Sequence, residues 1–301
     1  MKCEPASAVE QLIADQSTAW PLLVRGLHGL RESRTRQVHI DWYDVLIRHI
    51  PHRIGSTTAA VDPVSVQKRA CFLCAANLPV EERGVELDSE FTAYCNPFPI
   101  LEKHLTIVHR DHRPQAIAGR VDSLMRLTTL LPGYFFVYNG PECGASAPDH
   151  LHFQACSREI FPIERDARNV EGISIPDYGR RVLVQRDEDR RRLVERLEKL
   201  ISILADVTGK KPEPLINIAA FYESERWTVF VFPRAKHRPR VYETGELTVS
   251  PATIDLSGVF VIPKAADFDR IAGEDIQSIL EEVTLDAKAF NAVLKRLEDS
   301  R

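Results

Sequence analysis

The feature that most restricts the fold of this chain is a series of short strand-like runs in its first half, separated by turn residues. The runs lie at residues 91–94, 104–108, 133–138 and 150–155. Asn-Pro-Phe-Pro at 96–99 separates the first two, which is typical of a hairpin or meander. Asn139-Gly140 closes the third run, and a loop of small residues precedes the fourth. This part of the chain is therefore predicted to be mainly strand.

Segments with the apolar periodicity of helices lie before and after these strands in the sequence. Apolar residues recur near helical spacing over 9–30, with an interruption at Pro21, and again over 193–204, where Gly209 and Pro212 follow. Two further strands and a long final helix are expected at 228–232, 258–262 and 276–294. Because helices and strands mix without strict alternation, the predicted class is α+β, with a mainly antiparallel sheet and flanking helices.

The length of the chain bounds its domain organisation. With 301 residues it exceeds the usual single domain, so one large domain or two modest ones is expected. The segment 164–185 is polar and contains two glycines and a proline, which is typical of a connection. The pattern partly restarts beyond it. We therefore predict two halves, residues 1–165 and 166–301.

Charge and hydropathy exclude several classes of partner. The formal net charge of −4 argues against binding of nucleic acid through bulk electrostatics, and the clusters Arg180-Arg181 and Arg190–Arg192 are interpreted as solvated charge. No run approaches the roughly eighteen apolar residues of a membrane span. Residues 1–20 lack the basic-then-apolar order of a secretion signal. We expect a cytoplasmic protein that binds neither nucleic acid nor membrane.

The last strand-like run carries the residues best suited to chemistry. If it is a strand, His150, His152 and Gln154 lie on one face, and Leu151 and Phe153 lie on the other. An imidazole can attack phosphorus, and an amide N–H can bind a phosphoryl oxygen. The alternative is a solvent-facing strand edge that contains histidines, and this segment alone does not decide between the two.

The residues before this strand add a pattern that resembles a known family. Tyr-Asn-Gly at 138–140 and Gly-Ala-Ser at 144–146 form a loop whose backbone can approach a phosphate, with Ser146 as a further donor. Together with His-x-His-x-Gln at 150–154, this resembles the active-site strand of the nucleotidyltransferase branch of the histidine-triad superfamily. That branch includes galactose-1-phosphate uridylyltransferase, diadenosine tetraphosphate phosphorylase and GDP-L-galactose phosphorylase.

The last of these families is the most similar, and the resemblance extends into the second half. Residues 150–155 look most like GDP-L-galactose phosphorylase. Short segments that resemble the C-terminal half of that family lie at 255–259, 263–264, 267–268 and 281–283. The second half contains no His-x-His-x-Gln, so one catalytic centre per chain is expected.

The resemblance implies a histidine-triad-like fold of two related halves and a covalent mechanism. His152 attacks the α-phosphorus of a nucleoside diphosphate sugar, and a phosphate-bearing acceptor then attacks the nucleotidyl-histidine. Gln154 binds the α-phosphoryl oxygens. The expected partners are a nucleotide sugar or dinucleotide and inorganic phosphate, with a homodimer as a further expectation. The alternatives are a dinucleoside polyphosphate phosphorylase or hydrolase, and a non-catalytic nucleotide-binding protein.

A structural zinc site follows from the same resemblance. Cys71 and Cys74 form the only Cys-x-x-Cys pair among six cysteines, which on its own indicates a metal site, a redox pair or an accident. With His112 and His150 the pair resembles the zinc arrangement of galactose-1-phosphate uridylyltransferase, and thiolates with imidazoles suit tetrahedral zinc. His109 is the alternative to His112. Two cysteines without metal are the alternative to the site itself.

Further substrate contacts are expected around this strand. Asn96 resembles a family residue near the nucleoside, although Asn-Pro is also a common turn, and His104 is assigned a structural role. The loop contributes Asn139, Gly144 and Ser146. In the second half, a basic segment after a strand either binds a phosphate or is a solvated turn; its candidates are Arg234, Lys236, His237 and Arg238.

Overall fold

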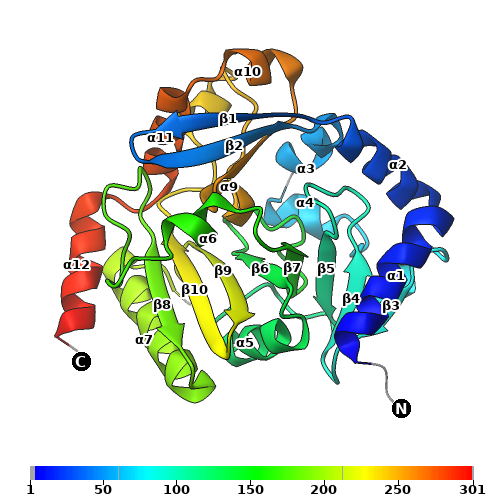
Figure 1. The fold of residues 1–301 in the computed structure, drawn as a ribbon, viewed down its shortest axis with the longest axis horizontal. Coiled ribbons are helices and arrows are strands. Elements are labelled where there is room, and N and C mark those ends of the chain that lie inside the picture. Colours follow the sequence, from blue (N-terminus) through cyan, green and yellow to red (C-terminus); the bar gives the residue numbers. More distant parts are fainter. Residues whose placement is uncertain (1–3, 60, 212, 300–301) are drawn as a thin grey trace.

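A computed structural model describes residues 4–59, 61–211 and 213–299. Its centre is an eight-stranded sheet in which every neighbouring pair is antiparallel (Figure 1). In spatial order its strands are β3 (Gly84–Glu86), β4 (Phe91–Cys95), β5 (Leu105–His109), β7 (His152–Ser157), β6 (Tyr134–Asn139), β9 (Ile216–Glu223), β10 (Arg226–Pro233) and β8 (Leu183–Asp187). The pairing of β6 with β9 joins strands of the first half to strands of the second.

A smaller sheet and the helices cover this centre. The smaller sheet contains β1 (Arg34–Ile40), β2 (Tyr43–His49) and β11 (Val259–Ile262), and β11 pairs with β2 in parallel. The helices are α1 (Pro5–Ala19), α2 (Pro21–Arg31), α3 (Ile54–Thr57), α4 (Pro63–Gln67), α5 (Val121–Leu130), α6 (Pro162–Asp166), α7 (Arg190–Thr208), α8 (Arg240–Glu243), α9 (Thr253–Leu256), α10 (Ala265–Arg270), α11 (Gly273–Val283) and α12 (Ala287–Glu298), with 3-10 turns η1 (Pro51–Arg53) and η2 (Ala75–Asn77). None of the described helices is long and apolar enough to cross a membrane.

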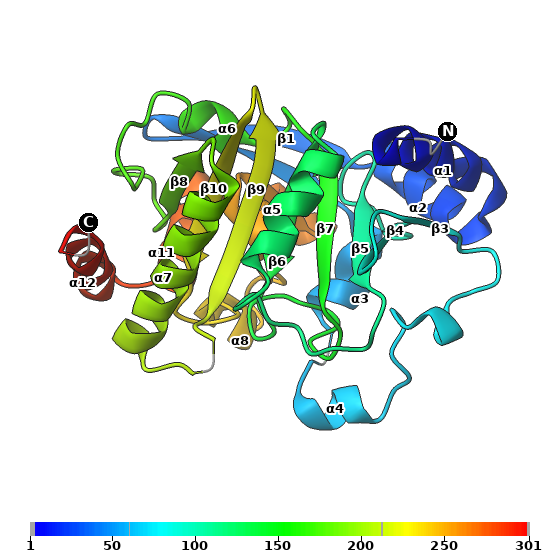
Figure 2. The same ribbon diagram turned by 90° about the horizontal axis from the view of Figure 1, so that it is seen from below.

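Two apolar cores lie on opposite faces of the large sheet. Along β6, Tyr134, Phe136 and Tyr138 belong to the core shared with α1, α5 and α7, and Phe135 and Val137 belong to the core shared with the smaller sheet and α11. Figure 2 shows α5 and α7 on one face of the large sheet and β1 beyond the other. Burial of each such side chain contributes about 1.5–3 kcal/mol, so β6 is held firmly from both faces.

The structure confirms the predicted α+β class. It also confirms that side chains alternate between the two faces of the strand that carries His152 and Gln154. β7 begins at His152, and Phe153 and Ala155 enter the core beneath it. His152 and Gln154 therefore lie on the opposite face, where Gln154 pairs with Thr106 of β5 on one side and with Val137 of β6 on the other.

The prediction of one long final helix is wrong. The chain forms α11 and α12, and Thr284 lies between them in a single β-bridge to Arg234. The Asp286 side chain accepts a hydrogen bond from the backbone N–H of Ala289 at 2.9 Å and so begins the second helix. Both helices bury an apolar face, so the apolar periodicity of the sequence continues across this break. The periodicity alone therefore does not show that a new helix begins after Asp286.

The interpretation of Arg180-Arg181 as solvated charge is wrong for Arg180. This side chain is only 1% exposed. Its Nε donates to the carbonyl of Leu256 at 2.7 Å, and its guanidinium lies 3.7 Å from the ring centroid of Tyr178. Arg180 is therefore part of the packing beneath α9.

Candidate active site

A cavity of about 680 Å³ lies over β4, β5 and β7, on the face of the sheet that carries His152 and Gln154. It brings most of the expected site residues together. Those that line it are Asn96, Asn139, Gly144, Ser146, His152, Gln154, His237 and Arg238. Residues from both halves of the chain therefore contribute to one site.

His152 is held with a single ring nitrogen available. Its Nδ1 lies 2.8 Å from the carbonyl oxygen of His150, which can only accept, so Nδ1 carries the proton and Nε2 is the unprotonated atom. No described residue contacts Nε2 through a hydrogen bond. Burial lowers the pKa of His152 to about 4, so the imidazole is neutral at neutral pH. This arrangement leaves Nε2 able to act as a nucleophile without prior deprotonation.

The orientation of Gln154 is fixed by His104. The backbone N–H of Ile100 donates to His104 Nδ1 at 3.1 Å, so the ring proton must be on Nε2. That Nε2 lies 2.9 Å from Gln154 Oε1 and donates to it. The amide nitrogen of Gln154 therefore remains free to donate two hydrogen bonds to a ligand in the cavity.

A buried glutamine that the sequence did not single out supports the active strand. Gln115 is 3% exposed, and its Oε1 accepts from the backbone N–H of His152 at 2.8 Å. Its Nε2 donates to the carbonyls of His152 and Asn139 at 3.0 and 2.8 Å. Gln115 thus joins the start of β7 to the end of β6, at the edge of the cavity.

Asn139 also presents its amide nitrogen to the cavity. Its Oδ1 accepts from the Oγ1 and the backbone N–H of Thr253 at 2.6 and 3.0 Å, and from Asn217 Nδ2 at 2.8 Å. These bonds fix which end of the amide is oxygen. The Nδ2 of Asn139 has no hydrogen bond to any described residue, so it is available to an anion.

The loop before β7 requires a glycine at one position. Gly144 has a φ of +101°, and a Cβ there would lie 2.7 Å from the Cβ of Ala252. Ser146 follows two residues later, and its carbonyl accepts from the Arg69 guanidinium at 3.3 Å. A larger residue at 144 would push this loop away from Ala252 and alter the wall of the cavity.

The basic segment of the second half divides into two parts. Arg234 and Lys236 do not line the cavity: Arg234 is buried and donates to the carbonyl of Val283 at 2.9 Å, and Lys236 pairs with Glu282 at 2.6 Å. His237 and Arg238 do line it.

These two cavity residues have different environments. Burial and the charges of Arg238 and Arg234 lower the pKa of His237 to about 4, so its ring is neutral. Arg238 donates to the carbonyls of Thr57 and Ala59 at 3.0 and 3.1 Å. It therefore ties the second half to the segment after η1.

Four ligating side chains gather beside the cavity. The ligand atoms of Cys71, Cys74, His112 and His150 all lie within 4.8 Å of one another, as a metal ion requires. His150 Nε2 donates to the carbonyl of His109 at 2.7 Å, which leaves its Nδ1 as the coordinating atom. The ring of His109 is not in this group, so the structure favours His112 as the ligand among the described residues.

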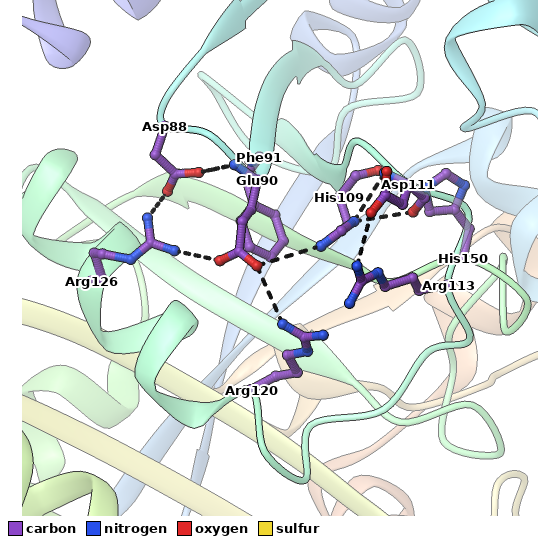
Figure 3. Close-up of polar contacts among 9 residues, drawn as sticks. All are labelled: Asp88, Glu90, Phe91, His109, Asp111, Arg113, Arg120, Arg126 and His150. Carbon is purple, nitrogen blue, oxygen red and sulfur yellow. Dashed lines mark hydrogen bonds and ion pairs between the residues drawn. The ribbon is translucent and has the colours of Figure 1, made fainter.

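Figure 3 shows the network behind His150. The ring of His109 accepts at Nδ1 from the backbone N–H of Asp111 at 3.0 Å, and its Nε2 lies 3.8 Å from Glu90 Oε1. Glu90 also pairs with Arg120 and Arg126 at 3.3 and 2.9 Å. These contacts anchor the segment whose carbonyl selects the coordinating nitrogen of His150.

Two cations of the cavity, Arg53 and Arg69, were not expected from the sequence. Arg53 lines the cavity and donates to the carbonyl of Phe98 at 3.1 Å. It comes from η1, a 3-10 turn remote in sequence from β7. Neither Arg53 nor Gln115 belongs to a recognisable motif, so only the fold brings them to the site.

Comparison with known proteins agrees with this geometry. A domain of unknown function (DUF4922) matches residues 12–157, and the GDPGP1-like C-terminal domain matches residues 155–298. Yeast Ap4A phosphorylase Apa2 in complex with AMP has the same fold, with a TM-score of 0.61, 14% identity, and coverage of 94% of this chain and 97% of that chain. Its complex with Ap4A gives a TM-score of 0.59 at 14% identity, over 92% and 97%. No curated protein sequence matches the chain.

Proposed function

We propose that this chain is a member of the nucleotidyltransferase branch of the histidine-triad superfamily and a phosphorylase of nucleoside diphosphate sugars, similar to GDP-hexose phosphorylases. The observation that carries the proposal is the state of His152. Its Nδ1–H is committed to the carbonyl of His150, and its Nε2 is unprotonated in a cavity large enough for a nucleotide.

The reaction proceeds in two displacements at one phosphorus. The lone pair of His152 Nε2 attacks the α-phosphorus, the bond from that phosphorus to the bridging oxygen breaks, and sugar 1-phosphate leaves. An oxygen of inorganic phosphate then attacks the same phosphorus, the N–P bond breaks, and nucleoside diphosphate is released. The imidazole carries a positive charge while the nucleotide is attached, and the carbonyl of His150 stabilises that charge. Neither the leaving group nor the acceptor needs a proton transfer.

Hydrogen-bond donors around His152 can stabilise the negative charge that develops on the α-phosphoryl oxygens. The free amides of Gln154 and Asn139 and the backbone around Gly144 and Ser146 can bind the α-phosphoryl oxygens. In this proposal Asn96 contacts the nucleoside. Arg53 and Arg238 offer positive charge to the departing and incoming phosphates, and His237 lines the same end. Arg234 and Lys236 act outside the cavity.

We propose that the Cys71, Cys74, His112 and His150 group holds a structural zinc ion. Two thiolates and two imidazoles form a closed set that suits tetrahedral zinc and leaves no position for substrate. When bound, the metal would fix the backbone of His150, whose carbonyl orients His152. The ion therefore supplies rigidity rather than chemistry to the transfer.

A second candidate is a dinucleoside polyphosphate phosphorylase with the same intermediate. It is favoured by the fold shared with a yeast enzyme whose structures contain AMP and Ap4A. Both candidates transfer a nucleotidyl group to phosphate, whereas a hydrolase transfers it to water. Substrate choice and phosphate dependence therefore separate the three.

The function is tested with a panel of nucleoside diphosphate sugars and dinucleoside polyphosphates, each with and without inorganic phosphate. We expect a GDP-sugar to give GDP and sugar 1-phosphate only when phosphate is present. Without phosphate, intact-protein mass spectrometry should find one nucleotidyl group added per chain. Release of nucleoside monophosphate without phosphate would identify a hydrolase, and the lack of any adduct would refute the covalent route.

Replacement of Gln154 by alanine should slow transfer by roughly a hundredfold, the usual loss when one charge-stabilising donor is removed. The loss should be in kcat, because the amide is expected to bind the transition state more strongly than the substrate. Gln277→Ala is the matched control, since Gln277 is half-buried on α11, does not line the cavity, and donates to Glu281 at 3.2 Å. Equal rates for the two variants would remove Gln154 from the reaction.

A further inference from the structure

The order of the strands indicates which way a nucleotide can lie in the cavity. Tyr94 of β4 pairs with Thr106 of β5, which pairs with Gln154 of β7, so these three residues form a row across the sheet. Strands lie about 4.8 Å apart, so Tyr94 is about 10 Å from the proposed phosphate site. Asn96 lies at the Tyr94 end and donates to Thr106 Oγ1 at 3.2 Å. A nucleotide with its α-phosphate at His152 can therefore place its base near β4.

The β4 end of the cavity is largely apolar but contains one carboxylate. Trp20, Leu78 and Phe98 are among its lining residues, and so is Glu82. No hydrogen bond or ion pair reaches the Glu82 carboxylate from any described residue. Burial raises the pKa of Glu82 to about 7, and burial together with the charge of Glu82 raises the pKa of Tyr94. Glu82 is half-buried, and its carboxylate has no hydrogen-bond donor among the described residues.

The position of Glu82 is fixed by its two neighbours. Gln16 of α1 is 1% exposed, and its Nε2 donates to the carbonyl of Glu81 at 3.0 Å. The Oε1 of the same side chain accepts from the backbone N–H of Arg83 at 3.0 Å. A buried amide therefore clamps the chain on both sides of Glu82. A side chain held so firmly without a partner suits recognition of a ligand.

We infer that Glu82 is the residue that selects guanine among the bases, an inference that rests on the proposed nucleotidyl transfer and adds to it the side chain that distinguishes one base from another. Guanine presents two adjacent donors, N1–H and the N2 amino group, which match the two acceptor oxygens of a carboxylate. These donors stabilise the ionised form of Glu82. Adenine presents an acceptor at N1, and uracil presents a single donor at N3, so neither base satisfies both oxygens.

The test uses Glu82→Gln and measures the binding of GMP and AMP by calorimetry. Wild type should bind GMP more tightly than AMP by on the order of 10- to 100-fold, the range of one good bidentate contact. In the variant, the affinity for GMP should fall by a similar factor, and the affinity for AMP should rise. The reason is that a carboxamide can donate to adenine N1 and accept from its N6 amino group.

Two further variants control this experiment. Glu81→Gln changes an exposed neighbour and should leave both affinities at wild-type values. Glu82→Asp keeps a carboxylate and should retain a preference for GMP, weakened by the shorter side chain, even if the glutamine variant fails to fold. Equal binding of GMP and AMP by wild type, or an unchanged preference in Glu82→Gln, would overturn the assignment.

The outcomes also separate this inference from the proposed function. If wild type prefers GMP, Glu82→Gln loses that preference, and no nucleotidyl group is transferred to phosphate, the proposed phosphorylase is wrong and the role of Glu82 stands. If it forms the adduct equally from GDP-sugars and ADP-sugars, the phosphorylase stands and the role of Glu82 is wrong.

Discussion

The His152→Asn variant is expected to lose turnover by at least about 10⁴-fold, because it lacks the ring nitrogen that forms the covalent intermediate. Folding should be little affected. The asparagine amide can still donate to the carbonyl of His150, which now accepts from His152 Nδ1 at 2.8 Å. Steady-state assays should show the loss of rate, and intact-mass measurement should show no nucleotidyl adduct in the absence of phosphate.

A matched substitution distinguishes the nucleophile from histidines in general. His28 lies on the surface of α2, with an exposed side chain 3.3 Å from Glu32. His28→Asn should keep both the wild-type rate and the adduct. The mechanism fails if His152→Asn turns over at the wild-type rate, or if an adduct still forms on it.

The Cys71→Ser/Cys74→Ser double variant is expected to lose the bound zinc and much of its thermal stability. Wild type prepared without chelators should contain close to one zinc per chain, since the four ligand atoms form a closed set. Loss of a structural metal should lower the melting temperature by on the order of 10 °C. Activity should fall as well, because His150 belongs to the proposed metal site and its carbonyl orients His152.

The alternative ligand provides the control for the metal site. His109→Gln should retain the zinc, because the ring of His109 lies outside the four-ligand group and only its backbone carbonyl contacts His150. Elemental analysis and thermal unfolding of the three proteins test both points. A metal-free wild type, or a cysteine variant that keeps its zinc, would show that the site is assigned wrongly while leaving the case for His152 intact.

The sequence predicted those parts of the site that depend on local spacing. Strand alternation places His152 and Gln154 on one face of β7 whatever the rest of the fold does, and the structure shows them there. The turn residues at 96–99 and 139–140 likewise marked the ends of β4 and β6. The α+β class and the hairpin of β4 and β5 follow from such local signals, because these two strands are neighbours in sequence.

The rest depends on contacts between distant segments. Gln115 reaches His152 across 37 positions, and Arg53 belongs to a 3-10 turn outside every motif. The role of His104 required knowing which atom donates to its Nδ1, and the sequence shows no such bond. Glu82 belongs to an unremarkable acidic segment, and only its burial in the cavity distinguishes it from Glu81.

The continuous sheet has a consequence for any attempt to divide this chain. Because β6 pairs with β9, a fragment that ends near residue 165 would leave the hydrogen-bonding edge of β6 uncovered. That strand reads Tyr-Phe-Phe-Val-Tyr-Asn and is buried along its whole length. An open edge of this kind recruits other chains into intermolecular sheets and amyloid-like aggregates. The first half therefore carries His152, the proposed nucleophile, yet it depends on β9 of the second half to cover the edge of β6.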